Sequence, residues 1–191
     1  MTLDDVAQKY AETTAAILMC GREKYFESAL RLLYSGIDSL SWLYSDQNDL
    51  EKRNVRNEYE GWVNIFLLPE LKKFGYDCTA TEIYYARCSQ LHTFSAIAKK
   101  QGDNRIVAYA SGDGENMNKV NQGLPDIEKM SNGKRFVIIH IGDLVQGFIN
   151  GTSHFFKLTE EDEELSNKVI EKADFYYAPL DTKVLNKEQN R

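Results

Sequence analysis

The sequence predicts a mainly α-helical fold, a helical bundle with a small β-hairpin insertion. Through most of the first 100 residues, apolar side chains recur at spacings of three and four, as in helices that bury one face. Beyond that point, two short β-branched runs flank a segment rich in Gly, Asn and Asp. The 191 residues are enough for one domain with a core. We therefore expect a single domain over residues 1–191, with a helical core at about 3–100 and the hairpin and C-terminal helices at about 101–180.

The first four helices are expected from their apolar stripes and from the residues that bound them. The second has the most regular stripe, and a threonine is placed to cap the fourth. Gly21 separates the first two helices, and Pro69 is expected to end or kink the third. The four predicted helices cover residues 3–20, 23–44, 51–68, and Thr79 or Thr81 to about Lys99.

The remaining elements are predicted after about residue 100, where the helical spacing of apolar residues gives way to β-branched runs and turn residues. Residues 105–110 and 135–140 are predicted strands, and we expect them to pair as an antiparallel hairpin across the long loop 111–133. A further helical stripe begins at Gly142, although two internal glycines lower its helix propensity. Thr159, which precedes three acidic residues, is the expected cap of a last helix that ends at about Phe175.

Composition restricts the class of function. The net charge of −6 argues against sequence-independent DNA binding, which requires many phosphate contacts from Lys and Arg. The three cysteines form an odd set without zinc spacing and, in the absence of a signal peptide, indicate free thiols in a reducing cytoplasm. The longest apolar runs are too short to cross a bilayer. We therefore expect a cytoplasmic protein with no membrane partner.

Arg87 and His92 form the most specific chemical pattern in the chain. They lie five positions apart on the fourth predicted helix. Arginine carries a permanent charge, and histidine is the side chain best suited to proton transfer near neutral pH. This combination suits cleavage of a phosphodiester that has a neighbouring 2′-hydroxyl. Five positions correspond to about 140° on an α-helix, which is poor for joint metal binding, so we expect a catalytic pair without metal or cofactor.

Each candidate residue also has a structural interpretation. On spacing alone, Arg87 is a solvated or ion-paired surface residue and His92 a hydrogen-bonded helix residue. Asp38 interrupts an apolar helical stripe, so it either orients Arg87 or His92 or lies on the exposed side. Cys88 and Ser89, directly after Arg87, are further candidates for supporting roles. A Cys88 nucleophile with His92 as base is a weaker alternative, because the sequence offers no third orienting group.

The surroundings of this pair resemble the HEPN superfamily, whose members are helical bundles with an Arg-x4–6-His motif on a late helix. The matching motif is Arg87-Cys88-Ser89-Gln90-Leu91-His92. It follows a long helix that contains residues 29–38 and a second helix with Glu60-Gly61-Trp62-Val63. The resemblance covers roughly residues 20–100, and the branch it looks most like is that of plasmid-encoded HEPN-like proteins of unknown role.

The resemblance implies a metal-independent endoribonuclease in a toxin or anti-phage defence setting. Two subunits of a homodimer would join their motifs into one composite site on RNA. Arg87 would hold the scissile phosphate, and His92 would act as general base or general acid. The sequence does not identify an antitoxin or sensor partner. Many catalytic members carry Asn, Asp or His where this chain has Cys88, so the alternative is a non-catalytic dimeric HEPN module that binds RNA, a nucleotide or a protein.

Overall fold

The computed structural model describes residues 1–93, 105–112, 124–126, 128–130 and 133–177. The fold is mainly helical, as predicted. Within the described ranges, no helix is long and apolar enough to cross a membrane. In chain order the elements are α1 (Leu3–Arg22), α2 (Phe26–Tyr44), the 3-10 helix η1 (Leu50–Lys52), α3 (Val55–Trp62), η2 (Val63–Leu67), α4 (Leu68–Lys73), α5 (Ala80–Cys88), η3 (Ser89–Thr93), β1 (Ile106–Ala110), β2 (Phe136–His140), α7 (Ile141–Glu161) and α8 (Glu163–Tyr177).

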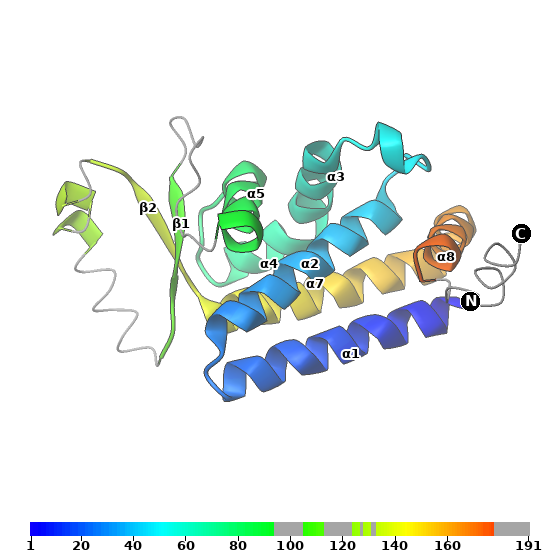
Figure 1. Ribbon diagram of the computed structural model, residues 1–191, viewed down its shortest axis with the longest axis horizontal. Coiled ribbons are helices and arrows are strands. Elements are labelled where there is room, and N and C mark those ends of the chain that lie inside the picture. Colours follow the sequence, from blue (N-terminus) through cyan, green and yellow to red (C-terminus); the bar gives the residue numbers. More distant parts are fainter. Residues whose placement is uncertain (94–104, 113–123, 127, 131–132, 178–191) are drawn as a thin grey trace, which may run out of the picture.

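Three long helices form the body of the molecule. α1, α2 and α7 lie side by side, and α3 and α5 lie together on another side of α2 (Figure 1). α8 packs near one end of this body, and the two strands lie at the opposite end. The apolar helix faces meet in one core that is rich in aromatic side chains, which bury a large area each. The largest fully buried residues include Trp42, Trp62, Tyr34, Tyr59, Phe66, Phe148 and Phe155.

The helix α5 begins at the first of the two predicted caps. Thr79 accepts a hydrogen bond from the Glu82 backbone N–H at 3.2 Å, and the Glu82 carboxylate accepts one from the Thr79 N–H at 2.9 Å. The same carboxylate accepts hydrogen bonds from the backbone N–H and the Nε of Arg105. The residue before β1 is therefore tied to the first turn of the helix that carries Arg87.

The third predicted helix does not end at Pro69. α3 passes into the π-helical turn η2 and then into α4, which continues to Lys73. Proline has no N–H for the carbonyl four residues earlier, and the π-helical turn before it changes the spacing of the backbone hydrogen bonds. The helix α7 packs closely on this turn, because a Cβ at Gly151 would lie 2.6 Å from the Phe66 carbonyl oxygen.

Replacing Gly151 with alanine is expected to destabilise the fold by about 1–3 kcal/mol, the range for overpacked cores. The added methyl group would meet the backbone of η2, which cannot rotate away as a side chain can. Gly61 on α3 is the matched control, because a Cβ there would have no heavy atom within 4 Å. Urea denaturation should show a lower midpoint for Gly151→Ala only. Equal midpoints for the two variants would contradict the close contact.

The predicted helix boundary at Thr159 is wrong. α7 runs unbroken from Ile141 to Glu161 and includes both glycines. Thr159 is fully buried, and its hydroxyl donates to the Phe155 carbonyl at 2.8 Å, so it is satisfied inside the helix. The following helix, α8, is capped instead by Asp162, whose carboxylate accepts a hydrogen bond from the Leu165 N–H at 3.0 Å.

Both predicted strands are present, but they pair in parallel, so the predicted antiparallel hairpin is wrong. Their register runs from Ile106 opposite Phe136 to Ala110 opposite His140. The connection, residues 111–135, is long enough for the crossover that parallel strands require. Within the predicted loop, residues 124–126 and 128–130 are helical. Both strands therefore end at the same edge, where α7 follows β2 directly.

Candidate functional site

Arg87, in the last turn of α5, is ion-paired with Asp38 from α2. The Arg87 Nε donates to Asp38 Oδ2 at 2.8 Å, and Nη2 donates to the same oxygen at 2.5 Å. The side chains of Arg87 and Asp38 are 13% and 22% exposed, so the pair lies largely out of solvent. Of the placements left open for Asp38, the structure has the one against Arg87. A carboxylate that receives two guanidinium N–H groups restricts the orientation of the cation.

The Asp38 carboxylate stabilises the charged form of Arg87 in these surroundings. Burial lowers the pKa of Arg87, but the hydrogen bonds and negative charge of Asp38 outweigh burial and hold that pKa above its ordinary value. An ion pair removed from solvent adds little net stability, because desolvation offsets the attraction. Charged groups with perturbed pKa values concentrate at functional sites, so this pair marks a candidate site.

The two residues after Arg87 lie in different surroundings. Cys88 Sγ lies 3.8 Å from Arg87 Nη1 and accepts a weak hydrogen bond from it. Ser89 is 1% exposed, and its hydroxyl donates to the Tyr85 carbonyl at 3.0 Å. Cys88 therefore belongs to the group formed by Arg87 and Asp38, whereas the Ser89 hydroxyl bonds to the backbone of its own helix.

The backbone between Arg87 and His92 departs from the α-helix that the sequence predicts. α5 ends at Cys88, and η3, which contains position 92, is π-helical, with hydrogen bonds between residues five apart. A π-helical turn holds more residues than an α-helical turn, so the angular offset between positions 87 and 92 is smaller than about 140°. The His92 side chain and the rest of this predicted helix, from residue 94, lie outside the described part of the structure.

Two residues of α3 that the sequence did not single out lie close to this site, Arg56 and Tyr59. The Tyr84 ring centroid lies 6.0 Å from the Arg87 guanidinium carbon and 5.7 Å from the Tyr59 ring centroid. The Arg56 guanidinium carbon lies 5.8 Å from the Tyr84 ring centroid and 5.5 Å from that of Tyr85. Two arginines are thus grouped with tyrosine rings, a combination suited to phosphate and base contacts.

The hydroxyl group of Tyr59 is buried next to these arginines and tyrosine rings. The residue is fully buried, and its hydroxyl has no hydrogen-bond partner among the residues that the structure describes. Burial, followed by the nearby Tyr34 and Asp38, holds the pKa of Tyr59 well above its ordinary value. The hydroxyl is therefore protonated and desolvated, which costs free energy that a phenylalanine would not.

We expect Tyr59→Phe to leave the free energy of unfolding unchanged or to raise it by up to about 1 kcal/mol. Tyr10 is the matched control, because it is also buried but its hydroxyl bonds to those of Ser39 and Tyr177. Tyr10→Phe is expected to lower the same free energy by about 1 kcal/mol. Denaturant titration of the two variants distinguishes them. A similar loss in both would mean that the Tyr59 hydroxyl makes a stabilising hydrogen bond.

Comparison with known proteins assigns no function to this site. Comparison with protein-family models, curated proteins and solved structures finds no match to this chain. In the part of the chain that the structure describes, no group of three or more His, Cys, Asp and Glu side chains is placed to hold a metal ion. The chemistry of the candidate site therefore has to be derived from Arg87 and its neighbours.

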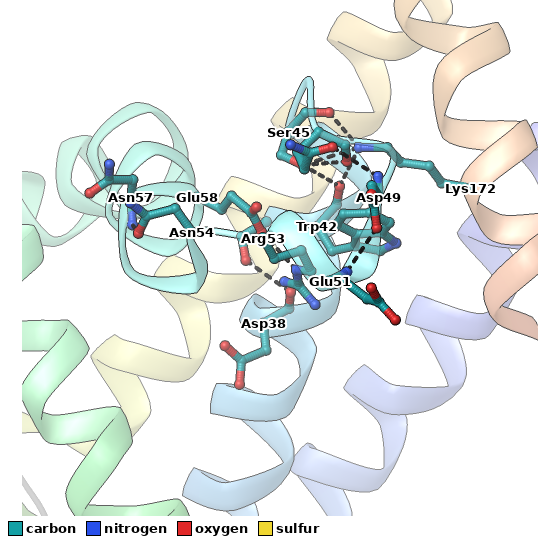
Figure 2. Close-up of polar contacts among 12 residues, drawn as sticks. Asp38, Trp42, Ser45, Asp49, Glu51, Arg53, Asn54, Asn57, Glu58 and Lys172 are labelled. Atoms are coloured by element: carbon teal, nitrogen blue, oxygen red, sulfur yellow. Dashed lines mark hydrogen bonds and ion pairs between the residues drawn. The ribbon is translucent and has the colours of Figure 1, made fainter.

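A second buried cation, which the sequence did not indicate, lies at the end of α2 (Figure 2). Lys172 of α8 is 5% exposed, and its Nζ donates to the Trp42 carbonyl at 2.8 Å, to the Ser45 carbonyl and to Ser45 Oγ at 3.1 Å. This Nζ lies 4.3 Å from the Trp42 ring centroid, and the Arg53 guanidinium carbon lies 4.6 Å from the same centroid. Burial lowers the pKa of Lys172 to about 8. Lys172 thus caps α2 and attaches α8 to it.

Proposed function

We propose that this chain is a metal-independent endoribonuclease of the HEPN type, acting in toxin or anti-phage defence, with Arg87 and His92 as its catalytic residues. The observation that carries the proposal is the Arg87–Asp38 ion pair, formed by residues 49 positions apart in sequence. Such a pair contributes little to stability. A guanidinium of restricted orientation, in the last turn of α5 just before the π-helical turn that contains position 92, is suited to binding a phosphate.

In this proposal Arg87 is the phosphate-binding residue and Asp38 is a positioning residue. The Arg87 guanidinium stabilises the negative charge that develops on the phosphoryl oxygens as the 2′-oxygen attacks phosphorus. His92 removes the proton from the 2′-hydroxyl or donates one to the departing 5′-oxygen. The products are a 2′,3′-cyclic phosphate and a 5′-hydroxyl, and neither proton transfer requires a metal ion or cofactor.

A homodimer would supply both proton-transfer groups. One His92 acts as the base while His92 of the partner subunit acts as the acid, because the two roles need opposite protonation states at the same time. A two-fold axis brings the same surface of both subunits together, which is the arrangement that a composite site needs. RNA is the substrate in this proposal, and a toxin of this kind is expected to have an antitoxin or sensor partner.

One observation favours a second candidate, a non-catalytic dimeric HEPN module that binds RNA, a nucleotide or a protein. The Arg87 side chain is 13% exposed and already bonded to Asp38, so a phosphate has limited access to it. Arg56 is 46% exposed and lies against Tyr85, so it is the more accessible cation for binding without cleavage. In this candidate the Arg87–Asp38 pair fixes how α5 lies against α2 and takes no part in a reaction.

Incubation of the purified protein with single-stranded RNA in the presence of a chelator tests the proposal. We expect fragments that end in a 2′,3′-cyclic phosphate, and no cleavage of DNA of the same sequence, which lacks the 2′-hydroxyl. Cleavage that stops in the chelator would contradict a metal-independent mechanism. Binding of RNA without cleavage would favour the second candidate.

A further inference from the structure

Arg56 of α3, like Arg87 of α5, is held in place by a carboxylate. Its Nε donates to Glu60 Oε1 at 2.8 Å, and the same oxygen accepts a hydrogen bond from the Thr81 hydroxyl at 3.0 Å. Because Thr81 lies in the first turn of α5, Glu60 connects Arg56 to the helix that carries Arg87. The orientation of the Arg56 guanidinium is therefore restricted relative to Arg87.

The bond to Glu60 leaves the phosphate-binding end of Arg56 available. It uses Nε, so this carboxylate does not occupy the two Nη groups, whose N–H pairs match two oxygens of a phosphate. The Arg56 side chain is also more exposed than that of Arg87, at 46% against 13%. The two guanidinium carbons lie 5.8 and 6.0 Å from the Tyr84 ring centroid, so phosphates of one strand can reach both arginines.

Tyr85 is the outermost of three neighbouring tyrosine rings. Tyr59 is fully buried, whereas Tyr84 and Tyr85 are partly exposed. The Tyr84 ring centroid lies 5.7 Å from that of Tyr59 and 6.0 Å from that of Tyr85. The Arg56 guanidinium carbon lies 5.5 Å from the Tyr85 ring centroid. A partly exposed ring that is supported by packed neighbours offers a preformed surface on which a base can stack.

A ring beside a phosphate-binding cation is suited to an unpaired nucleotide. In a duplex the bases stack on one another, and their faces are covered, so only a single strand can place a base on Tyr85. A purine has a larger ring system than a pyrimidine and covers more of the tyrosine ring. The preference that follows depends on stacking area rather than on hydrogen bonds to base edges.

We propose that Arg56 and Tyr85 form a subsite for an unpaired purine nucleotide, next to the phosphate that Arg87 binds. The base stacks on Tyr85, and the phosphate of the same nucleotide accepts hydrogen bonds from the Arg56 Nη groups. The subsite rests on the proposed ribonuclease function, because that function places RNA at Arg87. It adds that cleavage occurs in single-stranded RNA beside a purine and that substrate binding depends on α3 as well as on α5.

Fluorescence anisotropy with a 2′-O-methylated oligoadenylate, which cannot be cleaved because it lacks the attacking hydroxyl, measures binding at this subsite. Tyr85→Ala should weaken binding by about tenfold, the contribution of one stacked base, and Tyr85→Phe, which retains the ring, should stay within about twofold. Arg56→Met should weaken binding a few-fold and reduce the slope of log affinity against log salt by about 0.7, as for one phosphate contact on a single strand.

The structure of the oligonucleotide should matter in the same assay. Oligouridylate is expected to bind a few-fold more weakly than oligoadenylate, and a duplex at least about tenfold more weakly. Tyr176→Ala is the matched control for the protein. Tyr176 is 49% exposed and its ring centroid lies 5.4 Å from that of a neighbouring tyrosine, but it belongs to α8, at one end of the helical body (Figure 1). This variant should bind like the wild type.

Equal affinities of Tyr85→Ala and Tyr176→Ala, each shown to be folded by circular dichroism, would overturn the subsite. So would a duplex that binds as tightly as the single strand, or an unchanged salt slope in Arg56→Met. Cleavage of unmodified RNA separates this result from the proposed function. With an active wild type, Tyr85→Ala should raise KM and leave kcat nearly unchanged. If the wild type cleaves no RNA, the ribonuclease function fails, and binding of the methylated oligonucleotide still decides the subsite.

Discussion

Arg87→Ala is expected to slow RNA cleavage by about 100- to 1,000-fold, the usual cost of removing a group that stabilises charge in the transition state. Arg87→Lys retains the charge but not the planar fork that meets a phosphate, so it should recover only part of the rate. Asp38→Asn should have a smaller effect of about tenfold, mainly on kcat, because the guanidinium remains but is oriented less well. Steady-state kinetics on one RNA substrate measures all three.

The matched control for this series is Arg56→Ala. Arg56 is a cation from the neighbouring helix, and its ion pair with Glu60 is more exposed than that of Arg87. Its removal should change KM a few-fold and leave kcat unchanged. His92→Ala is expected to remove cleavage as completely as Arg87→Ala. Activity that survives either substitution in a folded protein would belong to another site or to a contaminant.

Lys172 is expected to make stability depend on pH in the alkaline range. In the folded protein burial lowers the pKa of Lys172 to about 8, whereas the unfolded chain has the ordinary value of 10.5. Between these values the unfolded chain binds more protons, so stability rises with pH across this window. The contribution is at most about 3 kcal/mol, since one pKa unit corresponds to about 1.4 kcal/mol. Below about pH 8 Lys172 is protonated in both states and adds no slope.

The measurement is the difference in unfolding free energy between the wild type and Lys172→Met at several pH values. The difference should be constant below about pH 8 and shift in favour of the wild type from there to pH 10.5. Lys157→Met is the control, because the Lys157 side chain is 72% exposed, and this variant should follow the wild-type curve. A Lys172→Met curve parallel to the wild type would show that the Lys172 ammonium is not destabilised by burial.

Local patterns in the sequence were sufficient to predict most elements but not how they pair. The apolar stripes of α1, α2 and α7 and the two β-branched runs depend on neighbouring residues, and all five were found. Strand direction depends on the path of residues 111–135, which no local pattern specifies. Thr159 has the residue type of a cap, but burial decides whether a hydroxyl caps a new helix or bonds within the old one.

In the candidate site, too, residue type identifies some members, whereas others acquire their surroundings only through packing. Arg87 is identifiable by residue type, and Asp38 is identifiable as an acid within an apolar stripe, so their partnership was one of the alternatives that the sequence left open. Arg56 and Lys172 have the appearance of ordinary surface cations in the sequence. Only the packing of α3 against α5 and of α8 against α2 gives them their surroundings. The π-helical turn η3 likewise has no sequence signature in this chain.

The parallel pairing of β1 and β2 has a consequence for the order of folding. α1 and α2 are neighbours in the chain and meet through the short turn at residues 23–25, so their contact closes at little entropic cost. The strands join only after residues 111–135 have been carried across, and contacts between distant segments form slowly. We therefore expect the α1–α2 pair in the folding nucleus and the strands to pair after it, while the contacts of α1 and α2 with α7 and α8, which join still more distant segments, form last.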